Sequence, residues 1–334
     1  MTGFRRDPIV GRWVIVSADE PMDVDQFYQL YSPVEKHHPE KCFFCIGREL
    51  DTPPEVYAVR PNGGEANGEG WVIRVVPNKF PALVIEGELE SRPIGLYDIS
   101  NGVGAHEVVI ETPDHFKTLA DLSFEEICEV IKAYRVRIND LQNDPRFQYI
   151  LVFKNFGASA GASIEHDHSQ IIALPLVPKN VKEELEGARG YFDYRERCIF
   201  CDMWRQERDE GVRVIYENND FITFCPFSSR FPFEMWIMPK YHSSRFHEIT
   251  DERAMELAKA LKDALIRLKL LLHNPPYNFV VHSSPLRGTY EHYHWHIEIM
   301  PRISRVAGFE WGSGFYIVPT TPELCAERLR KVIW

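Results

Sequence analysis

One pattern of cysteines and histidines occurs twice along this chain, and it constrains the fold more than any other feature of the sequence. Each copy has a Cys-x-x-Cys pair (Cys42–Cys45, then Cys198–Cys201), a single histidine, a long amphipathic run and a His-x-His pair. The spacing from the single histidine to the His-x-His pair is 51 residues in one copy and 52 in the other (His115 to His166, His242 to His294). A repeated order with matched spacing indicates an internal duplication.

Each copy also predicts the same order of secondary structure. A segment that starts with Glu and three apolar residues and ends on His eight positions later (107–115 and 234–242) precedes a helical run in both copies. Ser123 and Glu126 form a capping box before the first helix, and the second run, from Asp251 to Leu272, stops before two prolines. A β-branched and aromatic strand follows each helix, at 147–153 and 277–282. We therefore expect an α+β fold of two duplicated halves, 1–180 and 181–334, each an antiparallel sheet with a long helix.

The composition excludes several classes of protein. Hydrophobic residues make up 44% of the 334 residues and charged residues 26%, and no run reaches the ~18 apolar residues of a membrane span. The formal charge of −11 opposes a nucleic-acid partner, because such binding depends on clustered Lys and Arg. Pro8, Gly11 and Arg12 interrupt the apolar stretch near the N-terminus, which therefore lacks the core of a signal peptide. We expect a cytoplasmic protein with no membrane and no nucleic-acid partner.

The two Cys-x-x-Cys pairs indicate metal sites. In a chain without an export signal such pairs are more often metal ligands or redox dithiols than structural disulfides, and neither pair opens a helix after a strand as a redox motif would. Two thiolates and two imidazoles make a closed, tetrahedral zinc set with a structural role. We assign zinc to two such sets, Cys42, Cys45, His115 and His166, and Cys198, Cys201, His242 and His294. His37 and His38 are competing ligands that rank lower, because the second copy has no counterpart to them.

The second histidine of the first His-x-His pair is the candidate nucleophile. On an extended segment His166 and His168 face the same side, so His166 can bind a metal while His168 stays free. The preceding loop, 154–165, is rich in Gly, Ala and Ser, which suits close approach to phosphate oxygens. A neutral imidazole attacks phosphorus without prior deprotonation, and Gln170 on the same face can donate to a phosphoryl oxygen. The second copy puts Glu298 in the place of Gln170, and a carboxylate repels a phosphoryl group, so we expect chemistry in the first half only.

Over nearly its whole length the sequence resembles the galactose-1-phosphate uridylyltransferase family of the histidine-triad superfamily, including the branch with the plant ADP-glucose phosphorylase. The resemblance rests on specific segments, among them DPIVGRWVIVS, CFFCIGRE, VVPNKFPAL, FKNFGASAGASIEHDHSQ, FEMWIMPKYHSS and HWHIEIMP. It implies histidine-triad-like halves and a ping-pong reaction. In that reaction a histidine attacks the α-phosphorus of UDP-glucose, expels glucose 1-phosphate and passes the uridylyl group to galactose 1-phosphate.

The resemblance also implies roles for individual residues. It makes His168 the nucleophile and Gln170 the phosphate-binding glutamine, and it places substrate contacts at Asn78, Phe80, Asn155, Gly161 and Ser163. Glu310 matches a residue that contacts the hexose from the partner subunit, which implies a homodimer. Zinc in both sets agrees with the two-zinc branch of the family, with iron the alternative metal at the second. Other members build that second site from a glutamate and three histidines, for which the lower-ranked candidates are Glu184, His282, His294 and His296.

Departures from the family pattern bear on specificity. The usual His-Pro-His reads His-Asp-His here, with Asp167 between the histidines. The arginines that meet the nucleotide phosphates in many members are replaced by the acidic stretch 17–25, which leaves Arg12 and Arg74 as substitutes to test. Tyr316 stands where the family usually has a glutamine.

Three functions follow from these observations. The first is a UDP-glucose:hexose-1-phosphate uridylyltransferase that works through a uridylyl-histidine intermediate, with galactose 1-phosphate as acceptor. The alternative is an ADP-glucose phosphorylase, an adenylyltransferase with phosphate as acceptor, because the segments 153–163 and 275–278 particularly resemble that branch. A zinc-stabilised binding module, in which both His-x-His pairs are structural, is the third. The expected partners are a nucleotide sugar and a hexose 1-phosphate.

Overall fold

Residues 2–334, which the computed structural model describes, alternate between short strands and helices. The strands are β1 (Gly3–Arg6), β2 (Trp13–Val16), β3 (Tyr57–Val59), β4 (Ile73–Pro77), β5 (Arg92–Ile94), β6 (Tyr97–Ile99), β7 (Ala105–Ile110), β8 (Tyr149–Phe156), β9 (His168–Leu174), β10 (Val214–Glu217), β11 (Phe221–Phe224), β12 (Met235–Pro239), β13 (Tyr277–His282), β14 (His296–Pro301) and β15 (Tyr316–Val318).

The α-helices are α1 (Val24–Phe27), α2 (Phe124–Leu141), α3 (Lys179–Arg195), α4 (Ile199–Glu210), α5 (Asp251–Leu271), α6 (Gly308–Ser313) and α7 (Pro322–Arg330). Short 3-10 helices are η1 (Pro39–Lys41), η2 (Glu49–Asp51), η3 (Ala158–Ala160) and η4 (Phe246–Glu248). Within residues 2–334, a helix that is both long and apolar enough to cross a membrane does not occur.

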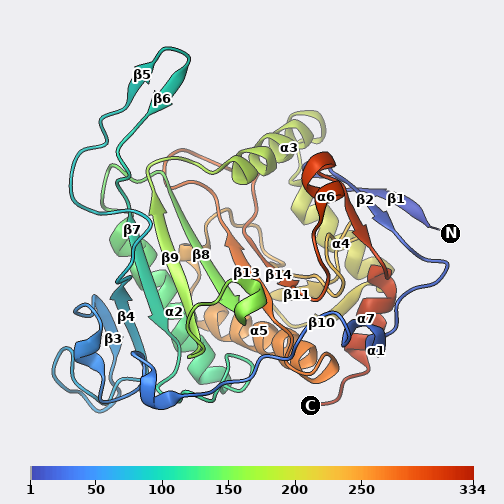
Figure 1. The fold of residues 1–334 in the computed structure, drawn as a ribbon. Coiled ribbons are helices and arrows are strands. Elements are labelled where there is room, and N and C mark those ends of the chain that lie inside the picture. Colours follow the sequence, from blue (N-terminus) through green and yellow to red (C-terminus); the bar gives the residue numbers. More distant parts are fainter. Residues whose placement is uncertain (1) are drawn as a thin grey trace.

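One antiparallel sheet of ten strands forms the centre of the part of the chain that is described (Figure 1). Its order is β10-β11-β12-β14-β13-β8-β9-β7-β4-β3. At its middle β8 pairs with β13, with Tyr277 opposite Phe156 and Val281 opposite Val152. Outward from this central pair, the two halves place equivalent strands in the same order: β9, β7, β4 and β3 on one side correspond to β14, β12, β11 and β10 on the other. The duplicated, antiparallel α+β fold is confirmed, and the structure adds that the two half-sheets are joined edge to edge, which leaves neither central edge unpaired.

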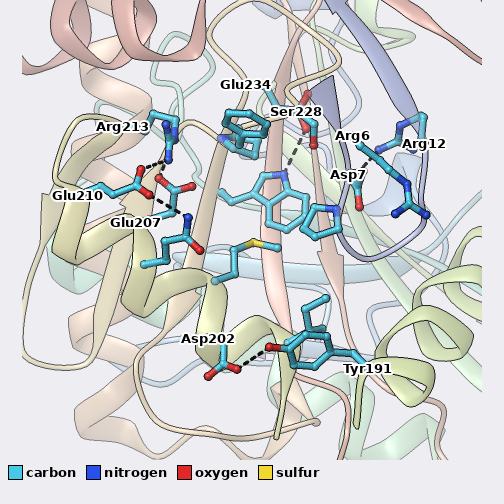
Figure 2. A pocket seen from close by; sticks show the side chains of 17 residues that line it. Arg6, Asp7, Arg12, Tyr191, Asp202, Glu207, Glu210, Arg213, Ser228 and Glu234 are labelled. Atoms are coloured by element: carbon cyan, nitrogen blue, oxygen red, sulfur yellow. Dashed lines mark hydrogen bonds and ion pairs between the residues drawn. The ribbon is translucent and has the colours of Figure 1, made fainter. Parts of the chain in front are cut away.

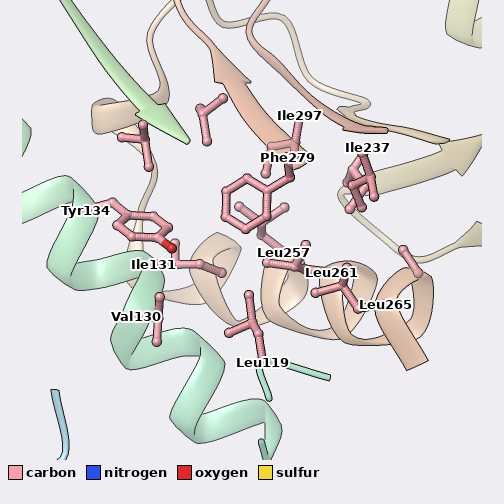
Figure 3. Close-up of a cluster of buried hydrophobic side chains, with 14 of the residues drawn as sticks. Leu119, Val130, Ile131, Tyr134, Ile237, Leu257, Leu261, Leu265, Phe279 and Ile297 are labelled. Atoms are coloured by element: carbon pink, nitrogen blue, oxygen red, sulfur yellow. The ribbon is translucent and has the colours of Figure 1, made fainter. Parts of the chain in front are cut away.

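Helices α2 and α5 lie against one face of this sheet and build the main core with it (Figures 1 and 3). The predicted capping box begins α2: the Ser123 side chain accepts from the N–H of Glu126, and the Glu126 side chain accepts from the N–H of Ser123. The core side chains come from both halves, and those labelled in Figure 3 are Leu119, Val130, Ile131, Tyr134, Ile237, Leu257, Leu261, Leu265, Phe279 and Ile297. Because the two halves share this core, the predicted boundary at residue 180, in the first turn of α3, stays a prediction.

The opposite face of the sheet carries the histidines and is covered differently in the two halves. In the second half, Phe200 and Trp204 of α4 pack on Phe224 and Trp236 of the sheet. In the first half, the segment around Phe44 packs on β4 and β7 in a smaller cluster. The first half therefore keeps room for a cavity on this face.

Candidate active site and metal centres

The first predicted set of cysteines and histidines converges beside the start of β9. Cys42 and Cys45 lie in the turns after η1, His115 follows β7, and His166 leads into β9. The Sγ of Cys42 lies 3.6 Å from Nδ1 of His166, and the Sγ of Cys45 lies 3.4 Å from Nδ1 of His115. The four ligand atoms lie within 4.8 Å of one another. The competing His37 stays outside this set, with its ring directed to Glu35, as does His38, which faces Glu40.

The second predicted set forms in the same way in the other half. Cys198 is the N-cap of α4, Cys201 lies in its first turn, and His242 and His294 come from the ends of loops beside β12 and β14. The Sγ of Cys201 lies 3.4 Å from Nδ1 of both histidines. These four ligand atoms also lie within 4.8 Å of one another.

Both sets fit a tetrahedral zinc ion. Ordinary zinc–sulfur and zinc–nitrogen bonds place a thiolate sulfur about 3.5 Å from an imidazole nitrogen at tetrahedral angles, close to the distances above. The far ring nitrogens are held by backbone carbonyls: Nε2 of His166 donates to Thr112 at 2.7 Å, and Nε2 of His294 donates to Pro239 at 2.9 Å. This leaves each Nδ1 lone pair directed at the sulfurs, as metal-binding histidines require. Four protein ligands fill the coordination sphere, so these sites suit a structural metal.

His168 opens β9 beside the first set, and a hydrogen bond fixes the orientation of its ring. Its Nδ1 donates to the carbonyl of His166 at 2.8 Å, which leaves the lone pair on Nε2. Burial lowers the pKa of His168 to about 4, so the imidazole is neutral at pH 7. The residue lines a cavity of 540 Å³ together with 32–35, 155–159 and 162–167. A neutral, fixed imidazole at a cavity is the arrangement that a nucleophile needs.

The loop between β8 and β9 forms one wall of this cavity and depends on glycine. Gly157 has φ +84°, and a Cβ built there would lie 2.5 Å from Cγ2 of Val34. Gly161 has φ +90° and forms the turn that leads to Ser163, which lines the cavity. Both backbone conformations are costly for residues with a side chain. The loop is therefore packed closely against the opposite cavity wall.

A residue of the second half fixes this loop across the central strand pair. The side chain of Asn278 in β13 donates to Oδ1 of Asn155 at 2.8 Å and to the carbonyl of Ala160 at 2.8 Å. Asn155, predicted to contact the substrate, also lines the cavity. The sequence did not predict this contact of Asn278, because it depends on the pairing of β8 with β13.

Gln170 lies on the same face of β9 as His168 and is oriented by a second residue that sequence reasoning missed. Nδ1 of His106 accepts from the N–H of Ala82 at 3.2 Å, so its Nε2–H donates to Oε1 of Gln170, at 2.7 Å. Because the oxygen of Gln170 is used in this bond, its amide N–H groups are the part that can donate to a phosphoryl oxygen. His106 also lies 3.1 Å from Nδ2 of Asn78, which links this predicted nucleoside contact to the same cluster.

The corresponding place in the second half is filled. Strand pairing puts Val108 opposite Gln170, and in the second half it puts Trp236 opposite Glu298. The Trp236 indole stacks on the ring of His296, with 4.7 Å between the ring centroids. His296 is fully buried. In the first half the smaller Val108 takes the position of Trp236, which agrees with chemistry in the first half only.

The structure does not bring the lower-ranked metal set together as predicted, because His294 belongs to the Cys198 set. Its other members, Glu184, His282 and His296, lie together with Glu298. Nδ1 of His282 lies 3.0 Å from Glu184, and its Nε2 lies 3.3 Å from Glu298. Burial opposes a charge on His282, but the two carboxylates raise its pKa to about 10. Each ring nitrogen of His282 therefore faces a carboxylate, and this geometry fits an ion-pair bridge as well as a four-residue metal set.

Another cavity, of 340 Å³, lies in the second half and is shown in Figure 2. Several of its charged side chains have partners within the lining: Arg213 pairs with Glu207 and Glu210, Arg12 pairs with Asp7, and Asp202 accepts from the Tyr191 hydroxyl. Of the described residues that line it, only Arg12 was a candidate for the predicted site, and its guanidinium pairs with Asp7. The cavity at His168 is therefore the candidate active site.

Several residues predicted from the sequence lie outside the cavity of their own chain. Phe80 is 84% exposed in the loop after β4, and Glu310 lies in α6, where it accepts from the N–H of Ala307. Their substrate contacts stay predictions. Arg74 is buried and pairs with Glu55 at 3.0 Å, and Arg12 pairs with Asp7. Both proposed substitutes for the family arginines therefore form ion pairs within this chain.

The duplicated sheet with its two Cys/His sets, and the neutral His168 at a cavity beside a glycine-rich loop, fit an enzyme that transfers nucleotidyl groups. The chain belongs to the galactose-1-phosphate uridyl transferase family, whose N-terminal domain matches residues 61–178 and whose C-terminal domain matches residues 184–332. It is 40% identical to the ADP-glucose phosphorylase of Arabidopsis thaliana, over 98% of this chain and 92% of that protein. It is 28% identical to the galactose-1-phosphate uridylyltransferase of Thermotoga maritima, over 99% of this chain and 98% of that protein.

A solved structure agrees with these sequence matches. The crystal structure of an ADP-glucose phosphorylase from Arabidopsis thaliana with bound ADP-glucose covers 100% of both chains, with 39% identity and a TM-score of 0.83. The relatives are transferases, and the protein is accordingly an enzyme of the nucleotidyltransferase kind.

Proposed function

We propose that the protein transfers a nucleotidyl group from a nucleotide sugar to a phosphate-containing acceptor through a covalent nucleotidyl-His168 intermediate. The observation that carries this proposal is the state of His168, a neutral ring whose Nδ1 is held by the carbonyl of His166 and which lines the cavity beside the glycine-rich loop. The relatives place such a reaction in carbohydrate metabolism.

His168 and the residues proposed around it divide the first half-reaction between them. Nε2 of His168 attacks the α-phosphorus, the bond from that phosphorus to the sugar phosphate breaks, and the sugar 1-phosphate leaves with the electron pair. The amide of Gln170 donates to a non-bridging oxygen as negative charge develops on it. Further phosphate contacts are proposed at Asn155, Gly161 and Ser163, and nucleoside contacts at Asn78 and Phe80.

The second half-reaction reverses the chemistry with a different phosphate. An oxygen of the acceptor attacks the same phosphorus, and the electron pair of the phosphorus–nitrogen bond returns to Nε2 of His168. The Nδ1–H stays bonded to the carbonyl of His166 throughout, so it supports the positive charge of the substituted ring in the intermediate. The imidazole is released neutral and ready for another turnover.

ADP-glucose as donor and inorganic phosphate as acceptor are the substrates we propose first. The identity of 40% with a protein named ADP-glucose phosphorylase, against 28% with the Thermotoga uridylyltransferase, supports this choice. UDP-glucose with galactose 1-phosphate is the second candidate, because both family domains match and His168 would react identically.

The Cys/His sets and the exposed helix α6 support two further parts of the proposal. We infer structural zinc in both sets, with iron the alternative at the second. We also infer a homodimer, in which Glu310 reaches the hexose in the neighbouring protomer. Within one chain α6 is exposed at Phe309 (48%) and Trp311 (78%), as a segment that docks on a second copy would be.

Steady-state assays with the two substrate pairs test the specificity. ADP-glucose with phosphate is expected to give ADP and glucose 1-phosphate, with a kcat/KM at least ~10-fold above that for UDP-glucose with galactose 1-phosphate. The opposite ranking would assign uridylyl transfer. Zinc-loaded, folded protein that turns over neither pair would contradict the proposed function.

A further inference from the structure

A group of buried charged side chains lies directly against the strand that carries His168, on the face opposite the imidazole. Lys154 of β8 is fully buried, and its Nζ donates to Oε2 of Glu111 at 2.6 Å and to the carbonyl of His168 at 3.0 Å. The same Nζ lies 3.1 Å from Oδ2 of Asp167. None of these three charged side chains has a role in the transfer reaction proposed above.

The outer members of this group connect β9 to the elements around the cavity. Asp167 accepts from the backbone N–H of Leu119 and lies 3.9 Å from Nζ of Lys36, whose neighbours in the chain line the cavity. Glu111 accepts from the hydroxyl of Tyr134 in α2, at 3.0 Å, and that hydroxyl bonds to Oγ of Ser169 at 2.7 Å. The hydroxyl of Tyr134 is visible at the sheet side of α2 in Figure 3. Residues 167–169 are therefore held by α2, β8 and the segment that contains Lys36.

The second half has no such group at the equivalent positions. His296 is the counterpart of His168, so the strand pairing makes Val281 the counterpart of Lys154, and the alternation along β14 makes Trp295 and Ile297 the counterparts of Asp167 and Ser169. These three side chains are apolar and at most 2% exposed. The same strand geometry therefore folds with apolar side chains at these positions. Burying charges there is unfavourable unless each one is paired, so the fold itself does not require the charged group. Only the half with the accessible nucleophile carries the charged group.

We propose that Lys154 and Asp167 are positioning residues for the transfer by His168, an inference that rests on the proposed function. Their contacts fix the carbonyl of His168 and the backbone on either side of it. Nδ1 of His168 is bonded to the carbonyl of His166, so the position of that backbone sets the position of Nε2 relative to the loop at 157–163. A misplacement of about 1 Å at a reacting atom can lower a rate by about 100-fold.

A charge-balanced double variant removes the contacts of the Lys154 ammonium group with Glu111, Asp167 and the carbonyl of His168, and is called the clamp variant. Lys154→Met with Glu111→Gln deletes one cation and one anion, keeps a partner for the Tyr134 hydroxyl and leaves Asp167 paired with Lys36. Arg137→Met with Glu107→Gln is the matched control. That ion pair is also buried between α2 and the sheet, with bonds of 2.8 and 2.7 Å, and its side chains make no hydrogen bond to residues 166–169.

Each variant is measured for its unfolding midpoint, its zinc content, its Kd for ADP-glucose and UDP-glucose, and the single-turnover rate at which nucleotidyl-His168 forms. We expect the clamp variant to be folded, to keep its zinc and to bind within ~3-fold of the wild type, while the rate falls at least ~100-fold. The control rate is expected to stay within ~3-fold.

Two results overturn the inference and leave the proposed function standing: a rate in the folded clamp variant within ~3-fold of the wild type, or an equal fall in the clamp and control variants. Wild-type protein that forms no adduct with either nucleotide sugar overturns both. If the double variant does not fold, Asp167→Asn replaces it, because it keeps the shape of the side chain and removes its charge. The same fall in rate, with zinc retained, is then expected, and an unchanged rate overturns the inference.

Discussion

Replacing Gly157 by alanine tests how closely the phosphate loop must approach the far wall of the cavity. Gly157 has φ +84° and ψ 152°, a conformation nearly restricted to glycine, so the backbone strain of an alanine costs about 1–3 kcal/mol. The new Cβ would also lie 2.5 Å from Cγ2 of Val34 and 3.0 Å from Cβ of Pro276, and such overpacking costs about 1–3 kcal/mol. Together we expect Gly157→Ala to lower the free energy of unfolding by about 2–6 kcal/mol.

Two other glycines provide matched controls that separate the cost of backbone strain from the cost of the steric overlap of the new Cβ. Gly161→Ala places its Cβ 3.6 Å from the Asn155 amide, an ordinary contact, so only the strain of φ +90° remains and the loss is about 1–2 kcal/mol. Gly190→Ala lies inside α3 with nothing within 4 Å of the Cβ, so we expect a gain of about 1 kcal/mol.

Urea unfolding followed by fluorescence, with KM for the nucleotide sugar measured in parallel, checks the glycine series. The expected order of stability is Gly190→Ala, wild type, Gly161→Ala and Gly157→Ala, with a raised KM in the last. A stability of Gly157→Ala within ~1 kcal/mol of the wild type would contradict this prediction, because it would mean that the backbone at 157 is not strained by alanine and that Val34 and Pro276 move aside at little cost.

Three further predictions concern the site, the metals and pH. Gln170→Met keeps the side-chain length but removes the donating amide, so the single-turnover rate should fall ~100–1,000-fold with zinc content unchanged; a fall below ~10-fold would argue against that role. Cys45→Ser and Cys201→Ser should each lose one metal equivalent by elemental analysis, but only Cys45→Ser should also slow adduct formation in protein that stays folded, because His166 of that set holds Nδ1 of His168. Equal slowing in both would contradict this distinction. The folded-state pKa of His282, about 10, exceeds its ordinary 6.5, so its charge stabilises the fold fully below pH ~6.5 and this contribution is lost as the pH rises through 10. Urea midpoints should therefore fall more steeply between pH 7 and pH 10 in the wild type than in His282→Gln, and parallel curves would refute the ion-pair assignment.

Features that repeat or follow a local rule were predictable from the sequence. The matched spacings identified both Cys/His sets, and the structure brings each together. The capping box at Ser123 and the helix that it begins rest on neighbouring residues. The alternation of side chains along a strand placed His166, His168 and Gln170 on one face.

Features that depend on pairing between distant strands were not predictable. The joining of the two half-sheets through β8 and β13 places Asn278 on the phosphate loop, and the spacing in the sequence carries no trace of that contact. The strand register also differs from the simple alignment of the repeated segments. Glu107 and Glu234 begin those segments, yet in the sheet the counterpart of Glu234 is His106. That shift of one residue hid both the role of His106 and the blocking position of Trp236.

We propose that His168, and not its counterpart His296, carries the nucleotidyl group. Intact-protein mass spectrometry after mixing with ADP-glucose or UDP-glucose, without acceptor, tests it directly in the wild type, His168→Ala and His296→Ala. We predict that the mass of one nucleotidyl group is added to the wild type and to folded His296→Ala, and that His168→Ala gains nothing. An adduct that persists in His168→Ala, or a wild-type protein unmodified by either nucleotide sugar, would contradict the account.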